Sequence, residues 1–199
     1  MKTKSITALV AALSVLLPAS LSAQDAPVQA QNGKAIVVFF SHAGDNYSVG
    51  KIKIGNTKRV ADMISEITGA PQWEIVPEKD YHVPYDKLTE IAQAEADNGE
   101  LPPYKGTLDV SEYDTIFIGG PIWWGTYPQV MFTFFKDHDL SGKTIIPFTT
   151  HEGSALGSTI QDLKNTYPNS TVTKGLAVYG HDAQNARPRV ERWLKSLGY

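Results

Sequence analysis

One stretch decides the fold: the apolar run KAIVVFF (Lys34–Phe40) leads through a polar loop into GNTKRVADMISEITG (Gly55–Gly69). The first part is apolar on both faces and predicts a strand that is covered from both sides. The second part predicts an amphipathic helix with Asn56 as its N-cap and Gly69 at its end. A helix start offers free N–H groups and the positive end of the helix dipole. This strand–loop–helix unit therefore predicts a binding site for a phosphate group.

Strands and helices alternate along the rest of the chain. We expect further strands at residues 72–76, 114–119, 143–150 and 172–179, and helices at residues 85–97, 128–135, from Ser154 onward, and 190–197. This alternation predicts an α/β fold with a mostly parallel sheet between two layers of helices. Ligands of such sheets bind at the C-terminal ends of the strands. The loops after the first, third and fourth strands should therefore converge on one ligand.

The composition excludes several classes of function. The chain has 199 residues, enough for one domain of this type, with 42% hydrophobic and 20% charged residues. It has no cysteine, which excludes disulfides, thiolate nucleophiles and cysteine-ligated metals. The five histidines lack close metal-ligand spacing, and there is no basic run that would indicate a nucleic-acid partner. We therefore expect neither a metal site nor nucleic-acid binding.

Residues 1–23 have the pattern of a secretory signal peptide. Lys2 and Lys4 precede an apolar run, and small residues up to Ala23 provide a cleavage site. The apolar run is shorter than the roughly 20 residues that span a bilayer, so we expect no stable membrane insertion. Residues 24–33 predict a flexible tether, and residues 34–199 form the single expected domain. The sequence thus predicts an exported protein, periplasmic or secreted.

Three loops together resemble the flavodoxin-like family, in particular its bacterial flavodoxin branch with an extended first loop. The matching segments are Ser41 with GNT (Gly55–Thr57), GPIWWGTYP (Gly120–Pro128) and TTHEGS (Thr149–Ser154). The resemblance covers about residues 34–199. It implies a flavodoxin-like three-layer sandwich with a five-stranded parallel sheet of order 2-1-3-4-5 and helices on both faces, and flavin mononucleotide (FMN) as the cofactor. It also points to a bacterial source.

The resemblance also implies which residues contact the cofactor. Ser41, Asn56 and Thr57 would bind the phosphate, and Trp123 or Trp124 would supply a face for the flavin ring while the other packs. No side chain is expected to act as a catalytic acid, base or nucleophile, because the flavin carries the redox chemistry. The full set of expected cofactor-binding residues is Ser41, His42, Gly55, Asn56, Thr57, Pro121, Ile122, Trp123, Trp124, Gly125, Thr126, Tyr127, Thr150, His151, Glu152 and Gly153.

Several functions fit this resemblance. The first is an FMN-binding redox protein that passes electrons between a partner reductase and an acceptor. The second is an NAD(P)H-dependent FMN quinone reductase, and the third is a flavin-free binding or scaffold protein that retains the fold. A serine hydrolase at Ser154 is the least favoured, because the Gly-x-Ser-x-Gly pattern is not satisfied. For a bound flavin, we expect Glu152 and the acidic chain to lower its reduction potential.

Overall fold

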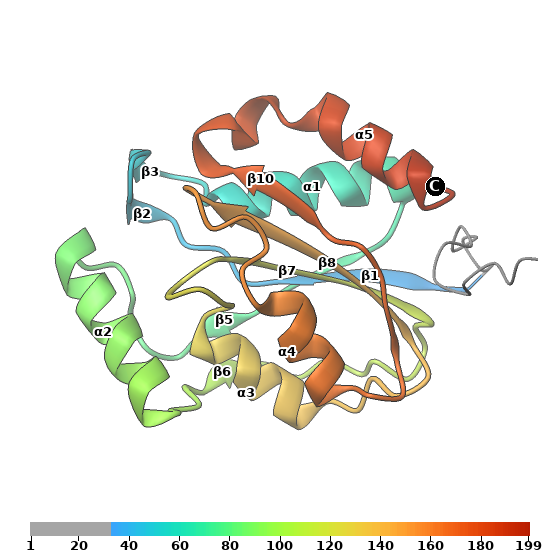
Figure 1. Ribbon diagram of the computed structural model, residues 1–199, viewed down its shortest axis with the longest axis horizontal. Coiled ribbons are helices and arrows are strands. Elements are labelled where there is room, and N and C mark those ends of the chain that lie inside the picture. The colour runs from blue at the N-terminus through green and yellow to red at the C-terminus, as the bar shows by residue number, and fades with distance from the viewer. Residues whose placement is uncertain (1–32) are drawn as a thin grey trace, which may run out of the picture.

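The computed structural model describes residues 33–199, and its centre is a parallel sheet in the order β10-β8-β7-β1-β4 (Figure 1). In chain order this is the expected 2-1-3-4-5 arrangement, so the prediction of a flavodoxin-like α/β sandwich is confirmed. The predicted signal peptide and residues 24–32 of the predicted tether lie outside the described residues. The five strands of this path are β1 (Ala35–Phe39), β4 (Gln72–Glu74), β7 (Thr115–Pro121), β8 (Thr144–His151) and β10 (Leu176–Tyr179).

Helices cover both faces of the sheet, with α1 and α5 on one side and α3 and α4 on the other (Figure 1). Side chains of β1 alternate between the two apolar cores, because successive residues of a strand point to opposite faces. Ile36 and Val38 belong to the core under α3 and α4, and Val37 and Phe39 to the core under α1 and α5. The helices are α1 (Asn56–Thr68), α3 (Gln129–Asp137), α4 (Thr159–Thr166) and α5 (Arg187–Ser196).

The fifth expected strand, residues 172–179, is interrupted. A short strand β9 (Thr171–Val172) pairs with the start of β8, and β10 pairs with its end. Between them, Pro147 of β8 has no N–H to donate to a neighbouring strand. The chain passes this point at Gly175, where a Cβ would lie only 2.8 Å from the Pro147 carbonyl oxygen. Both residues therefore accompany a break in the edge strand.

Three expected helix starts are displaced. The N-cap of α1 is Gly55, and Asn56 is the first helical residue. Pro128, expected within the helix, is the N-cap of α3. The helix expected from Ser154 begins instead at Thr159, because residues 153–157 form a tight turn with positive φ at Gly153, Ala155 and Gly157. Ser154 is therefore not an N-cap.

One hairpin, a second pair of short strands and one helix extend the structure beyond the sheet. The long first loop forms the hairpin β2 (Gly44–Asn46) and β3 (Gly50–Ile52), which the sequence did not indicate. A second pair, β5 (Val76–Pro77) and β6 (Tyr104–Lys105), brackets α2 (Tyr85–Asn98), which matches the expected helix. A short 3-10 helix (Gly180–Asn185) follows β10. Within residues 33–199, no helix combines the length and hydropathy needed to cross a membrane.

A buried carboxylate fixes α2 against the segment that precedes it. Glu95 is 1% exposed, and its two oxygens accept hydrogen bonds from the Tyr81 hydroxyl at 3.0 and 2.9 Å. The Lys79 ammonium group lies 2.6 Å from Glu95 Oε1. Burial, followed by the charge of Glu95, raises the pKa of the Tyr81 hydroxyl, which therefore remains a donor. This network positions the helix that forms one wall of the site described below.

We expect Glu95→Ala to lower the free energy of unfolding by about 1–3 kcal/mol, because it leaves the buried Tyr81 hydroxyl without its acceptor. Urea unfolding at neutral pH measures the change. The matched control is Glu90→Ala on the same helix, which removes an exposed pair with Lys87 and should cost less than about 1 kcal/mol. Equal losses in the two variants would contradict the anchoring role of Glu95.

Candidate functional site

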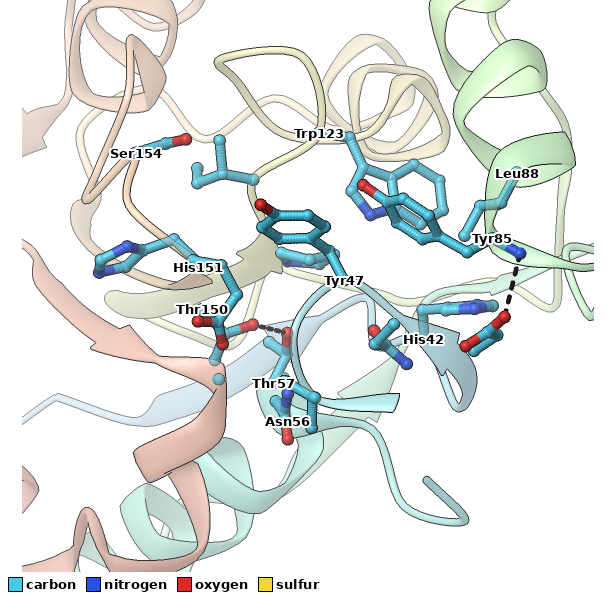
Figure 2. A pocket seen from close by; sticks show the side chains of 17 residues that line it. His42, Tyr47, Asn56, Thr57, Tyr85, Leu88, Trp123, Thr150, His151 and Ser154 are labelled. Carbon is cyan, nitrogen blue, oxygen red and sulfur yellow. Dashed lines mark hydrogen bonds between the residues drawn. The ribbon is translucent and has the colours of Figure 1, made fainter. Parts of the chain in front are cut away.

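A cavity of about 250 Å³ lies at the C-terminal ends of β1, β7 and β8 (Figure 2). Figure 2 shows Asn56 and Thr57 at one end of the cavity and Trp123 and Leu88 at the other. The first, second and third predicted loops all contribute to its wall, as expected for a parallel sheet. Of the predicted residues, those lining it are His42, Asn56, Thr57, Pro121, Ile122, Trp123, Thr150, His151 and Glu152.

The end of β1 and the start of α1 are in close contact. Ser41 Oγ accepts the N–H of Lys58 at 3.0 Å, and Arg59 donates its N–H to the Gly55 carbonyl. A Cβ on Gly55 would lie 2.2 Å from Ser41 Oγ, so only glycine permits this approach. Ser41 and Gly55 thus position the helix start and do not line the cavity. The N–H groups of Asn56 and Thr57 precede the first helical hydrogen bond and have no partner within the helix.

Hydrogen bonds join the loops around the cavity. Thr57 Oγ1 and Thr150 Oγ1 lie 2.8 Å apart and connect α1 to the end of β8 (Figure 2). The Thr150 carbonyl accepts the N–H of Ile122 at 2.9 Å, which connects β8 to the loop after β7. Gly180 closes the wall behind them, because a Cβ there would lie 2.6 Å from Asn56 Nδ2. The three predicted loops are therefore held as one unit.

The loop after β7 forms a tight turn that separates the two adjacent tryptophans. Trp123 and Thr126 exchange two backbone hydrogen bonds, and φ is +50° at Trp124 and +87° at Gly125, as in a type I′ turn. Trp123 packs edge-on against Phe40, with ring centroids 5.4 Å apart, and also lines the cavity. Trp124 is 56% exposed and does not line it. Of the two tryptophans, Trp123 is therefore the one placed to contact the expected flavin ring.

The indole of Trp124 is attached to the neighbouring helix. Its Nε1–H donates to the Thr89 carbonyl of α2 at 3.1 Å. Asparagine and glycine usually occupy the two central positions of a type I′ turn, since both tolerate positive φ. A residue with a large side chain pays about 1–2 kcal/mol for the left-handed conformation. The turn thus keeps a strained and exposed aromatic residue in contact with α2.

Two histidines of the cavity wall are neutral. His151 Nδ1 accepts the N–H of Gly153 at 2.9 Å, so the ring proton of neutral His151 lies on Nε2. Burial lowers the pKa of His151 and also that of His42, whose pKa the nearby His82 lowers further. His42 packs edge-on against Trp123, at a centroid distance of 5.9 Å. Both rings therefore present uncharged surfaces to a ligand at neutral pH.

Glu152 is paired with a histidine that sequence reasoning did not select. Glu152 Oε2 lies 2.7 Å from His181 Nδ1, and Oε1 accepts the backbone N–H of His181 at 2.9 Å. The hydrogen bond that His181 donates to Glu152 raises the pKa of His181 above its usual value, and the more distant Asp182 adds to the shift. The negative charge that Glu152 brings to the cavity is therefore offset whenever His181 is protonated.

The cavity also has a wall that the sequence did not reveal. Tyr47, at the tip of the β2–β3 hairpin, faces Tyr85, at the start of α2, with ring centroids 5.8 Å apart. Asp45 Oδ2 accepts the Tyr85 backbone N–H at 3.3 Å and so connects the hairpin to α2. The only sequence signal was the unusual length of the first loop. The residues missed are Asp45, Asn46, Tyr47, Val49, Tyr85, Leu88, Ser154 and Gly180.

Several expected contact residues lie elsewhere. Tyr127 is in the core, where its hydroxyl donates to the Ile118 carbonyl at 3.0 Å and burial raises its pKa. Thr126 Oγ1 donates to Asp162 at 2.5 Å. Thr126 and Tyr127 immediately precede Pro128, the N-cap of α3, and their side chains stabilise the turn and the core. The predicted residues outside the cavity lining are Ser41, Gly55, Trp124, Gly125, Thr126, Tyr127 and Gly153.

The geometry bears on two other readings of the sequence. Ser154 lines the cavity, but His151 Nδ1 is engaged by Gly153 and cannot accept a proton from that serine. The arrangement therefore does not favour a serine hydrolase. Among residues 33–199, no group of three or more histidine, aspartate or glutamate side chains is placed to hold a metal ion.

We expect the ring of His181 to titrate above the ordinary histidine pKa of about 6.5, because Glu152 stabilises the protonated form. The stability that this pair contributes is present below pH 6.5 and is lost as the pH rises through the raised pKa. An NMR titration of the ring C–H signals measures the midpoint. Glu152→Gln should lower it, and Asp182→Asn, which removes the contact at 3.7 Å, should lower it less. An unchanged midpoint in Glu152→Gln would contradict the pairing.

Comparisons with known proteins agree with this architecture. A candidate flavoprotein from Bacteroides uniformis is 30% identical over 83% of this chain and 99% of its own, with a TM-score of 0.68. A candidate flavoprotein from Bacteroides eggerthii is 27% identical over 84% and 99% of the two chains, with a TM-score of 0.66. A flavoprotein from Lactobacillus acidophilus, solved in complex with FMN, shares the fold at 21% identity over 81% and 99%, with a TM-score of 0.60. No curated protein matches. A family model described as flavodoxin matches residues 34–197, and the chain belongs to the flavodoxin family.

Proposed function

We propose that this protein binds FMN in the cavity at the ends of β1, β7 and β8 and serves as an exported redox protein. One observation carries the proposal: the cavity has unpaired helix N–H donors at one end and the Trp123 ring at the other. FMN needs donors for its phosphate and an apolar, aromatic surface for its ring. The family membership and the FMN complex of the Lactobacillus relative support the same cofactor.

The phosphate end relies on neutral donors. The N–H groups of Asn56 and Thr57 and the hydroxyls of Thr57 and Thr150 face this end, with the α1 dipole behind them. Lys58, the nearest cation in the sequence, instead forms an ion pair with Asp62 at 2.7 Å. A bound phosphate would therefore be held by hydrogen bonds and the helix start.

The ring end is aromatic, and the Asp45 carboxylate beside it accepts the Tyr85 N–H. Trp123 offers a stacking surface, Tyr47 and Tyr85 lie across from α1, and neutral His151 carries a donor at Nε2. Stacking on an aromatic side chain contributes about 0.5–1.5 kcal/mol of binding free energy beyond that from the burial of apolar area. When bound, FMN supplies the electron-transfer chemistry, and the chain's own residues orient it and limit its contact with water.

Two roles follow for such a flavoprotein. The first is an electron carrier between a partner reductase and an acceptor protein. The second is an NAD(P)H-dependent FMN quinone reductase, and a further cavity next to Trp123 favours it by offering room for a small acceptor. A carrier should stabilise the one-electron-reduced flavin and show no turnover. A reductase should oxidise NAD(P)H continuously when a quinone is supplied.

Titration of FMN with the purified chain, residues 24–199, tests the proposal through quenching of flavin fluorescence. Trp123→Leu should weaken binding about tenfold, as the loss of ring stacking and packing predicts. Trp193→Leu is the control, because Trp193 packs against Phe117 on the opposite face of the sheet. A folded chain that does not bind FMN would overturn the proposal and favour a flavin-free binding protein.

We expect Thr57→Val to weaken FMN binding about tenfold while leaving riboflavin binding unchanged. The substitution keeps the shape of the side chain but removes a hydroxyl of the Thr57–Thr150 pair, which would donate to the charged phosphate, a hydrogen bond of about 1.5–3 kcal/mol. Riboflavin lacks the phosphate and therefore controls for changes at the ring end. If the binding of FMN and that of riboflavin weakened equally, Thr57 would not contact the phosphate.

A further inference from the structure

A second cavity, of about 460 Å³, lies between α2 and the turn that follows β7. It adjoins the first cavity, and the residues that line both are Tyr85, Leu88, Ile122, Trp123 and Ser154. Leu88 is 3% and Ala92 7% exposed, so the wall on the α2 side is buried and apolar. The proposed flavin site does not account for the whole of this space, because Thr89, Ala92, Trp124 and Gly125 line the second cavity alone.

None of the described residues that line this second cavity is charged at neutral pH. The start of α2 offers an anionic ligand little stabilisation, because the Asp45 carboxylate already accepts the Tyr85 N–H there. Asp86, in the first turn of the same helix, adds another negative charge. Transfer of a charged group into such surroundings is unfavourable. The cavity therefore selects against phosphates, carboxylates and dinucleotides.

Trp124 supplies the second observation. It keeps a left-handed φ of +50° and a largely exposed ring, although asparagine would satisfy the same turn without strain. Its indole bonds to the Thr89 carbonyl, so the ring forms a wall of the second cavity. Packing in the core does not explain an exposed tryptophan. Backbone strain of this kind is retained where a functional contact requires it.

We propose that the second cavity binds an uncharged, planar aromatic molecule between α2 and the two tryptophans. The proposal rests on the proposed function, in which this molecule lies next to the flavin across Trp123 and Tyr85. Trp123 and Trp124 offer aromatic surfaces from the turn, and Leu88 and Ala92 offer an apolar wall from α2. The hydroxyls of Thr89 and Ser154 provide a few polar contacts for an aromatic carbonyl. The substrate class is thus set by the absence of charge in this wall and by its two indoles.

Calorimetric titration of the FMN-loaded chain with 2-methyl-1,4-naphthoquinone tests this site. The charged analogue 1,4-naphthoquinone-2-sulfonate is the matched probe and should bind at least about tenfold more weakly, because its sulfonate must be desolvated. Binding of the neutral quinone should persist at saturating FMN. If FMN displaces it completely, the quinone occupies the flavin cavity and the second site is refuted. Equal affinity for the two probes would refute the assigned substrate class.

Two variants locate the site. Ala92→Leu should fill the cavity and abolish quinone binding, and Gln93→Leu on the exposed face of the same helix should not change it. Trp124→Asn should weaken quinone binding about tenfold and leave the melting temperature unchanged or higher, because asparagine relieves the turn. If Trp124→Asn keeps full quinone affinity, the proposed contact between the Trp124 ring and the quinone is refuted. Quinone bound equally by Ala92→Leu and Gln93→Leu would place it elsewhere.

The FMN titration separates this proposal from the proposed function. A chain that binds FMN but not the quinone overturns only the second site. A chain that does not bind FMN overturns the proposed function, and the quinone titration on that chain still tests the second cavity through Ala92→Leu and Gln93→Leu. Capture of a protein through the exposed Trp124 ring, without quinone binding, would instead identify a docking surface and refute the small-molecule site.

Discussion

The site depends on how closely the start of α1 approaches the end of β1. The contact is possible because Gly55 has no side chain and because Ser41 accepts the Lys58 N–H. This leaves the N–H groups of Asn56 and Thr57 directed to the edge of the sheet, where Thr57 also meets Thr150 of β8. A larger residue at position 55 would push α1 away and separate both the helix start and the Thr57–Thr150 bond from the other loops. One glycine therefore controls the geometry of the whole end of the cavity at which we propose that the phosphate binds.

Apart from the Asp45 carboxylate, which accepts the Tyr85 N–H, the electrostatics of the site are close to neutral despite the acidic chain. Lys58 is paired with Asp62, His42 and His151 are uncharged, and Glu152 is offset by protonated His181. The expected lowering of the reduction potential of a bound flavin by Glu152 should therefore depend on pH. Below the raised pKa of His181 the pair is neutral, and above it the carboxylate is uncompensated. The field of Glu152 on a bound flavin should be stronger in alkaline solution.

Local sequence patterns predicted the layers of the fold and the three loops of the site. The alternation of strands and helices predicted the parallel sheet, because apolar runs such as Ile36–Phe40 are typical of strands covered on both faces. The order of the strands came from the family resemblance. The patterns did not reveal Tyr47 and Tyr85, which line the cavity through long-range contacts of a hairpin and α2. Nor did they reveal His181, which pairs with Glu152 from the segment after β10. Nor did they show that Tyr127 turns into the core. Side-chain direction near a turn depends on φ values that no periodicity encodes.

The two adjacent tryptophans show how one turn can contribute to the walls of two cavities. In a strand or helix, neighbouring side chains would point in directions set by the periodicity of the element. In the type I′ turn, the positive φ of Trp124 directs its ring to α2 while Trp123 packs against Phe40 and closes the first cavity. A simple carrier would need only the contacts of Trp123. The strain at Trp124 is therefore best explained by a requirement on the α2 side, where a small acceptor would be within reach of a flavin held behind Trp123.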